Sequence, residues 1–202
     1  MSERSGGFTI WITGLPFSGK KLLASQVKMR LEAIGLEAEI LEGGQIRRRF
    51  EDRLGFTREQ VAHNLARIGF EAELLAEAGK VAVVVAISPF RDHREDARRK
   101  LGRFVEVYCR CPLEVLEQRD RRGFYARART GQIENVAGVS YPYEPSELCE
   151  VTTDTDRESP EDGAQKVLAA AERMGFIRIV DHSVLTREEE EALRRRLRDS
   201  FD

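Results

Sequence analysis

A glycine-containing loop between an apolar strand and a helix constrains this chain more than any other feature. The run Phe8–Thr13 is apolar and β-branched, as expected of a buried parallel strand, and Gly14 ends it. Residues Gly14–Lys20 match G-x-x-x-x-G-K, and apolar residues recur at helical spacing through Lys20–Ile34. This order predicts a phosphate-binding loop, whose N–H groups surround phosphate oxygens. An ordinary glycine turn is the alternative.

The last position of the loop departs from the usual pattern. Lys21 stands where the motif has Ser or Thr, whose hydroxyl binds Mg²⁺. The preceding lysine, here Lys20, is the residue that reaches the β- and γ-phosphate oxygens. The sequence therefore predicts a nucleotide site and leaves its metal chemistry open.

Strand and helix patterns alternate along the chain, which predicts an α/β fold. Further strands are expected at Glu37–Leu41, Val81–Ile87 and Phe104–Cys109, with a weaker one near Leu148–Thr152. Helices are expected at Lys20–Ile34, Arg58–Ala78, Asp92–Leu101, Leu113–Arg119 and Pro160–Met174. The expected architecture is a three-layer sandwich of the P-loop NTPase type, with a central parallel sheet covered on both faces and ligands at the carboxyl ends of the strands.

Two segments fall outside the alternation. The stretch 120–147 has glycines, aromatics and many cations but little periodicity, and we interpret it as a lid over a bound substrate. The expected division is one domain over residues 1–180 and a helical tail over 181–202. In the tail, acidic Glu188–Glu191 precedes basic Arg194–Arg196, which suits the helix dipole. A solvated surface helix explains this pattern better than a functional tail.

Composition narrows the functional classes. The 202 residues contain 33 Lys and Arg against 35 Asp and Glu, and this balance gives no argument for a nucleic acid or membrane partner. No apolar run has transmembrane length, and Met1–Arg4 does not resemble a signal peptide. The cysteines Cys109, Cys111 and Cys149 are sparse, so reduced thiols in a cytoplasmic protein are expected. Packing explains Cys109 and Cys111 better than a metal or redox pair.

Several sequence blocks carry a family resemblance. In order, they are the Gly14–Lys20 loop, Leu41–Arg47 (LEGGQIR), Leu54–Glu59 (LGFTRE), Asn64–Gly69 (NLARIG), Ile87–Arg91 (ISPFR), Gly123–Arg129 (GFYARAR) and Gly138–Pro145 (GVSYPYEP). From about Phe8 to Phe176 the chain resembles adenylylsulfate kinases (APS kinases). The resemblance implies transfer of the γ-phosphoryl group of ATP, with Mg²⁺, to the 3′-hydroxyl of adenosine 5′-phosphosulfate (APS). The product would be PAPS.

The same resemblance implies site residues and partners. Nucleotide-binding positions would be Gly14, Ser18, Gly19, Lys20, Lys21 and Arg119, with Lys20 and Ser88 in catalytic roles. Positions for APS would be Arg47, Phe56, Asn64, Arg67, Ile87, Ser88, Pro89 and Arg127, with Phe56 stacking on adenine. The implied ligands are ATP, ADP, APS and PAPS. Whether the protein forms a homodimer, and whether it associates with ATP sulfurylase, are both left open by the sequence.

The chemistry of these residues is consistent with an anionic ligand. A phosphosulfate needs fixed cations, and guanidinium groups bind such oxyanions in a forked geometry. Arg47 follows an expected strand end, where ligands bind. A solvated charge run remains the better explanation for Arg48 and Arg49, and a core position remains open for Phe56.

Departures from the family pattern fall on the site itself. Lys21 replaces the metal-binding hydroxyl, Gly44 replaces the second Asp of L-D-G-D, and Val136 replaces an aromatic residue of the adenine site. Phe17 stands where the loop usually has backbone freedom like that of glycine. No residue is assigned to metal binding, because the expected Mg²⁺ ligands are missing.

Three functions stay open on this evidence. The first is a working APS kinase with an altered metal site and attenuated activity. The second is a catalytically silent domain that binds APS, PAPS or ADP and regulates a sulfate-activating partner. The third is a kinase for another small hydroxylated substrate. Mg²⁺-dependent turnover of APS would separate the first from the second.

Overall fold

A five-stranded parallel sheet forms the centre of the molecule. The computed structural model describes residues 6–49 and 55–178. Its strands are β1 (Phe8–Thr13), β2 (Ala38–Glu42), β3 (Val81–Val85), β4 (Phe104–Arg110) and β5 (Val151–Asp154). Their order across the sheet is β2-β3-β1-β4-β5, and Ile10 of β1 pairs with Val83 on one side and Val105 on the other. This confirms the predicted α/β class.

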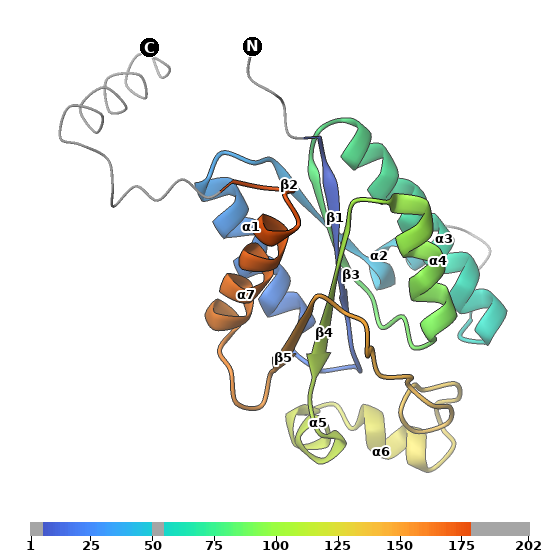
Figure 1. Cartoon of the computed structure of the whole chain (residues 1–202). Coiled ribbons are helices and arrows are strands. Elements are labelled where there is room, and N and C mark those ends of the chain that lie inside the picture. Colours follow the sequence, from blue (N-terminus) through green and yellow to red (C-terminus); the bar gives the residue numbers. More distant parts are fainter. Residues whose placement is uncertain (1–5, 50–54, 179–202) are drawn as a thin grey trace, which may run out of the picture.

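Helices cover both faces of the sheet (Figure 1). They are α1 (Lys20–Ala33), α2 (Gly43–Arg49), α3 (Arg58–Glu77), α4 (Arg91–Leu101), α5 (Leu113–Arg119), α6 (Phe124–Arg129) and α7 (Pro160–Arg173). Helices α1 and α7 pack on one face, and α3 and α4 lie on the other. Helices α5 and α6 lie beyond the carboxyl ends of the strands (Figure 1).

The central strand β1 contributes to two separate cores. Phe8, Ile10 and Ile12 pack with apolar residues of α1 and α7, whereas Trp11 packs with those of α3 and α4. Side chains alternate along a strand, so both faces must be apolar when helices cover both. This explains why Phe8–Thr13 is an unbroken apolar run.

The start of the longest described helix follows the pattern expected from its sequence. The Thr57 hydroxyl accepts from the backbone N–H of Gln60, whose side chain accepts in return from the Thr57 N–H. This reciprocal capping box satisfies two N–H groups that the helix itself leaves free. Helix α3 therefore begins at Arg58, as predicted.

Two short helices were not predicted, and one strand lies further along the chain than expected. Helix α2 has 7 residues and begins with two glycines, which disfavour a helix, and α6 has 6 residues in a stretch with little periodicity, so neither showed a helical pattern in the sequence. Helix α6 lies inside the stretch 120–147 that was interpreted as irregular. Strand β5 starts at Val151 rather than near Leu148. Residues 181–202, the predicted tail, lie outside the described part.

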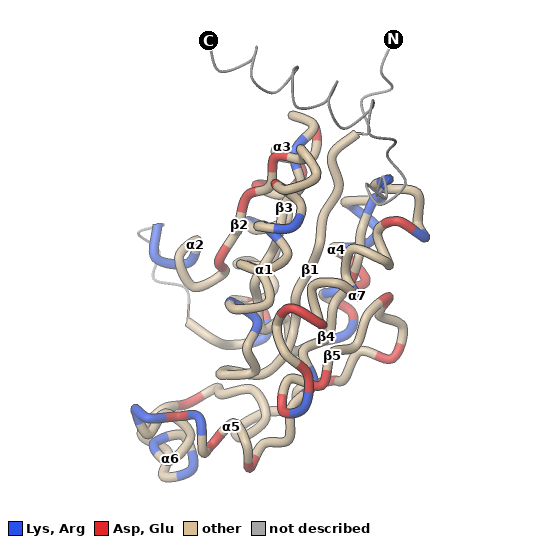
Figure 2. Tube along the Cα trace, turned by 90° about the vertical axis from the view of Figure 1, so that its left-hand side faces the viewer, with Lys and Arg blue, Asp and Glu red and all other residues tan. Residues whose placement is uncertain are grey.

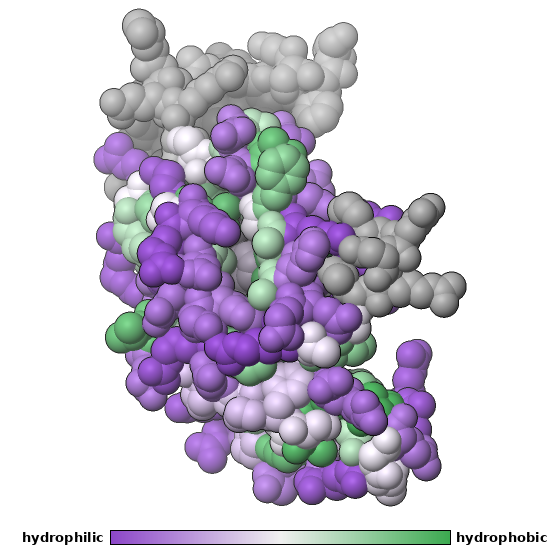
Figure 3. Space-filling view, turned by 90° about the vertical axis from the view of Figure 1, so that its right-hand side faces the viewer, coloured by the Kyte–Doolittle hydropathy of each residue, from purple (hydrophilic) through white to green (hydrophobic). Residues whose placement is uncertain are grey.

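The surface over α3 and α4 is mainly hydrophilic with a narrow hydrophobic band (Figure 3). Phe70 and Leu74 on α3 are 61% and 50% exposed, and they account for part of the apolar surface on this helix. In the described ranges, no helix is both long enough and apolar enough to cross a membrane.

Candidate nucleotide site

A cavity of about 640 Å³ lies where the glycine loop meets α2, α3 and the segment after β3. Among the residues lining it are Ser18, Gly19, Lys20, Lys21, Arg47, Phe56, Asn64, Ile87, Ser88, Pro89 and Arg119. These residues lie up to 101 positions apart in the sequence, from Ser18 to Arg119. The fold therefore brings most of the predicted site into one place.

A smaller cavity of about 340 Å³ adjoins the first. Thr153, Thr155, Glu158, Ser159 and Pro160 line it, together with residues shared with the larger cavity. The shared residues are Phe17, Gly19, Leu22 and Arg119. The Arg119 guanidinium donates to the backbone oxygen of Thr155 at 2.6 Å, which holds its side chain at this boundary. The two cavities therefore adjoin one another at the glycine loop.

The charge of the larger cavity suits an anionic ligand. Among the described residues, five cations line it, namely Lys20, Lys21, Arg47, Arg48 and Arg119, against the single carboxylate of Glu42. Lys and Arg also concentrate along α2 and α6 (Figure 2). Such a concentration of like charge attracts phosphate or sulfate groups.

Among these cations, Lys20 has the pKa that departs most from its ordinary value. It opens α1 directly after Gly19, which adopts a left-handed conformation with φ 80°. Its ammonium donates to the backbone oxygens of Gly14 at 2.9 Å and Leu15 at 2.6 Å and to the Ser18 hydroxyl at 3.2 Å. Burial lowers the pKa of Lys20 to about 8, because the three oxygens that it contacts are neutral and do not offset the loss of hydration. The neighbouring Cys109 is a neutral thiol at neutral pH, since burial raises its pKa to about 12.

The glycine loop contacts the predicted lid directly. Phe17 has φ 62°, a conformation that favours glycine, so a side chain there costs strain. Its ring lies 5.8 Å from that of Phe124 and 5.9 Å from that of Tyr125, both on α6. The Tyr125 hydroxyl donates to the backbone oxygen of Pro16 at 2.9 Å. The aromatic contacts offset the strain and dock α6 on the loop.

Lys21 forms an ion pair with another residue that lines the larger cavity. Its ammonium lies 2.5 Å from a Glu42 carboxylate oxygen at the end of β2. The Lys21 side chain is 72% exposed, so the pair contributes little to stability. Gly44, two residues after Glu42, has no side chain and therefore supplies no carboxylate for a metal ion. Within the described residues, no cluster of three or more His, Cys, Asp or Glu side chains could hold a metal ion.

Two polar groups in the larger cavity stand out. The amide nitrogen of buried Asn64 donates to the Gly43 oxygen at 3.2 Å, whereas its Oδ1 has no partner among the described residues. A buried acceptor without a partner is costly unless a ligand supplies the donor. Buried Ser88 has φ 46°, and its hydroxyl accepts from the Trp11 indole N–H at 2.9 Å.

Arg47 and Phe56 contact one another at the cavity wall. The guanidinium carbon of Arg47 lies 4.2 Å from the centre of the Phe56 ring, in a cation–π contact, and Arg47 also donates to the Gly55 oxygen. Partial burial lowers the pKa of Arg47, which nevertheless remains charged. Phe56 is 48% exposed, so it is a surface residue of the cavity and not part of the core.

Four predicted positions lie away from this wall. Gly14, whose oxygen accepts from Lys20, Arg67 on α3 and exposed Arg127 on α6 are not among the residues that line the larger cavity. Val136 is buried in a small lid core with Leu116 and Tyr125. Their assigned roles toward a ligand stay predictions.

Sequence reasoning missed three residues of the site region. Glu42 and Tyr141 line the cavity, and each lies inside a block that resembles the family. Arg94 is fully buried behind Ser88, although it sits in the highly charged run Arg91–Lys100 of α4. A carboxylate at a strand end could have indicated Glu42, but no local signal indicated Arg94.

Comparison with known proteins gives a consistent result. The family model of adenylylsulphate kinase matches residues 6–154. An adenylyl-sulfate kinase of Synechococcus sp. (strain JA-3-3Ab) is 40% identical over 171 residues, which cover 85% of this chain and 97% of that protein. A probable bifunctional SAT/APS kinase 2 of Sorangium cellulosum is 39% identical over 171 residues, but the chain spans only 29% of its length.

Solved structures agree with these sequence matches. The Mycobacterium tuberculosis APS kinase CysC, in complex with AMPPNP and APS, superposes with a TM-score of 0.78 at 36% identity, over 83% of this chain and 98% of that one. A gluconokinase from Sinorhizobium meliloti, with a TM-score of 0.57 at 21% identity and coverage of 85% and 95%, shares the fold.

Proposed function

Because the chain belongs to the adenylylsulfate kinase family, we propose that it transfers the γ-phosphoryl group of ATP to the 3′-hydroxyl of APS, giving PAPS. The observation that carries the proposal is the pair of cavities that meet at the glycine loop. A phosphoryl transfer between two nucleotides needs two sites whose reacting ends converge, and this arrangement supplies them.

The smaller cavity is the proposed donor side. ATP would place its adenine beside Arg119 and its phosphates over the loop at the border with the larger cavity, where Lys20 would exchange backbone oxygens for phosphate oxygens. Catalysis of phosphoryl transfer rests mainly on positioning and on neutralising charge spread over phosphate oxygens. Lys20 and the α1 N-terminus contribute to both tasks.

The larger cavity is the proposed acceptor side. Arg47 would bind the phosphosulfate group, and Phe56 would exchange its contact with Arg47 for a stack on the adenine ring. The unpartnered Asn64 Oδ1 would accept from a hydroxyl or amine of APS. Ser88 and its neighbours Ile87 and Pro89 would form the opposite wall.

The loop residues do not fit the Mg²⁺ anchor that the family typically uses. A P-loop holds this ion with a hydroxyl and a carboxylate, whereas Lys21 places an ammonium there and engages Glu42. Two cations within bonding distance of the same carboxylate would repel one another. We propose that Lys21 neutralises part of the phosphate charge that the ion otherwise neutralises.

A coupled assay with ATP, Mg²⁺ and APS tests the proposed reaction. PAPS should form, and Lys20→Ala should abolish its formation while leaving the protein folded. If ADP and PAPS bind with micromolar affinity but no PAPS forms, the proposed activity is wrong. The Lys21–Glu42 pair would then favour the second candidate, a silent domain that reports nucleotide occupancy.

The double variant Lys21→Thr with Gly44→Asp tests the proposed role of Lys21. A Cβ at Gly44 would meet only the Arg48 guanidinium at 3.8 Å, so aspartate fits without a clash. The variant should bind ADP in a strongly Mg²⁺-dependent manner, measured by calorimetry with and without chelator, whereas the unmodified protein should not. Each single variant is the control, because groups that act on one ion are not additive. Strong Mg²⁺ dependence of the unmodified protein would contradict the proposal.

Location and assembly belong to the same proposal. The described cysteines Cys109, Cys111 and Cys149 form no disulfide, which is consistent with a cytoplasmic protein. The hexameric APS kinase from Thiobacillus denitrificans, 28% identical with a TM-score of 0.64, supports an oligomer, and this chain covers 31% of that one. Association with ATP sulfurylase would place supply and use of APS together.

A further inference from the structure

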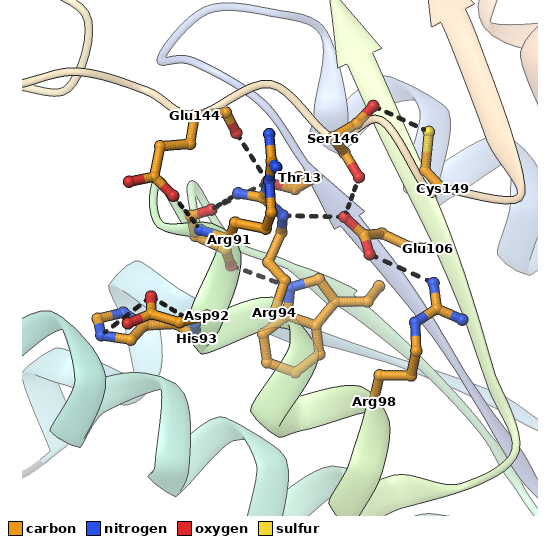
Figure 4. A network of polar contacts seen from close by, with 12 residues as sticks. Thr13, Arg91, Asp92, His93, Arg94, Arg98, Glu106, Glu144, Ser146 and Cys149 are labelled. Carbon is orange, nitrogen blue, oxygen red and sulfur yellow. Dashed lines mark hydrogen bonds and ion pairs between the residues drawn. The ribbon is translucent and has the colours of Figure 1, made fainter.

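A buried arginine joins the two chain segments behind the larger cavity. Arg94 on α4 is 1% exposed, and all three of its guanidinium nitrogens donate hydrogen bonds (Figure 4). Nε donates to Glu106 Oε1 at 2.9 Å, Nη1 to the Ser88 backbone oxygen at 2.6 Å and Nη2 to the Glu144 backbone oxygen at 2.8 Å. A planar guanidinium can hold three acceptors at fixed angles, which lysine cannot.

Glu106 provides the charge that keeps this arginine in place. It projects from β4, is 4% exposed, and also accepts from Arg98 at 3.3 Å and from the Ser146 hydroxyl at 2.5 Å. Burial of a charge is tolerated only when its partners replace the lost water. Because the Glu106 carboxylate has three donors and projects from an inner strand of the sheet, it holds the Arg94 guanidinium in one position.

The first segment that Arg94 holds is the wall that carries Ser88. Ser88 lines the larger cavity with φ 46°, a backbone conformation that needs support in a residue other than glycine. Arg94 binds its carbonyl oxygen, while the Trp11 indole binds its hydroxyl. These two contacts fix both the backbone and the side chain of Ser88.

The second segment is the end of the lid. Glu144 receives the Arg94 bond at its carbonyl, and its own N–H donates to the Pro89 oxygen at 2.8 Å. Tyr141, in the same block, lines the larger cavity and stacks on Phe90 at 5.5 Å between ring centres. Arg94 therefore binds both walls from behind without lining the cavity itself.

We propose that Arg94 is a positioning residue for the acceptor nucleotide. It holds Ser88 and the 138–145 segment at the spacing that APS requires, and it makes no contact with the donor side. The inference rests on the proposed function for the identity of the acceptor. It predicts that loss of Arg94 weakens binding in the larger cavity and leaves the smaller cavity intact.

The test compares Arg94→Met with Arg98→Met, a matched control in the same ion network. Arg98 donates to Glu106 and Glu150 but to neither wall. Arg94→Met should weaken PAPS binding about 10- to 100-fold in calorimetry, because the two walls would then have to be ordered when the ligand binds. ADP binding should be unchanged, and Arg98→Met should change neither.

A second variant covers the case in which Arg94→Met does not fold because it leaves Glu106 unpaired. Arg94→Met with Glu106→Leu removes both charges, which buried sites often accept without loss of stability. Folded protein with wild-type PAPS affinity, or an equal loss for ADP and PAPS, would overturn the proposal.

Hydrogen exchange tests the role of Arg94 independently of whether the cavity binds APS. In the Arg94 variant, residues 87–90 and 138–145 should lose protection together, whatever ligand the cavity takes. If the unmodified protein does not bind PAPS, the proposed function is wrong. Unchanged protection of both segments would show that Arg94 does not position them.

Discussion

At the scale of single residues, the site depends on charges that the fold leaves incompletely compensated. Lys20 is buried and bonded only to neutral oxygens, so a bound phosphate raises the pKa of its ammonium above the value in the free protein. Lys21, one position later, is exposed and already paired with Glu42. Neighbouring lysines thus have different tasks because one points into the loop and the other toward β2.

We expect ADP affinity to fall as pH rises above about 8. The free enzyme loses the Lys20 proton near its lowered pKa of about 8, and the bound phosphate restores it, so binding takes up a proton above that pH. Calorimetry in buffers of different ionisation enthalpy should show this uptake at about pH 9, with affinity dropping up to tenfold per pH unit.

Lys20→Arg is the control for this pH dependence. Its guanidinium stays charged throughout the range, so any binding that remains should not decline between about pH 8 and pH 9.5. A flat profile for the unmodified protein would mean that Lys20 keeps its charge in the free state.

At the scale of secondary-structure elements, close packing of α7 on α1 supports the helix that begins at Lys20. Gly163 on α7 lies so near its neighbours that a Cβ there would be 2.9 Å from Leu23 of α1 and 3.1 Å from Thr153 of β5. Leu23 is 2% exposed and has little room to move. The glycine is therefore required by packing rather than by backbone conformation.

Gly163→Ala should lower the free energy of unfolding by about 1–2 kcal/mol, because overpacking outweighs the better helix propensity of alanine. Gly69→Ala on α3 is the matched control, since a Cβ there meets nothing within 4 Å. That change should stabilise the protein by up to about 1 kcal/mol. Urea denaturation measures both, and stabilisation by Gly163→Ala would contradict the packing argument.

At the scale of the whole molecule, the segment 120–147, the predicted lid, contacts the glycine loop at one end and the wall that carries Ser88 at the other. Helix α6 rests on the glycine loop through Phe17, and the 138–145 segment rests on the opposite wall through Tyr141 and Arg94. A ligand in the larger cavity lies between these supports. Closure and phosphate binding are therefore expected to depend on one another.

We expect residues 120–147 to gain protection from hydrogen exchange when PAPS or APS binds. The segment has one helix of 6 residues and a small apolar core, so few buried contacts stabilise it in the free protein. Helix α3, with its capping box and long apolar face, is the internal reference and should change little. Equal protection of 120–147 with and without ligand would argue against a lid.

Much of this architecture could be predicted from local sequence patterns. The glycine loop, the buried run Phe8–Thr13 and the start of α3 at Arg58 were identified because each depends on residues within one or two turns of chain. The order of strands and helices followed from the same periodicities. In contrast, α2, α6 and β5 were missed or misplaced because they show no clear local pattern. Their sequences adopt structure only when they pack against the rest of the fold.

The sequence by itself determined that this chain is an α/β protein with a phosphate-binding loop and a lysine in place of the usual hydroxyl. Only the tertiary structure determined which partner each charge has. Lys21 meets Glu42 and Arg94 meets Glu106, Ser88 and Glu144 because parallel strands end at a common edge and helices pack over them. Contacts between residues far apart in sequence leave no local pattern, so a charged run on α4 gave no sign that one arginine is buried.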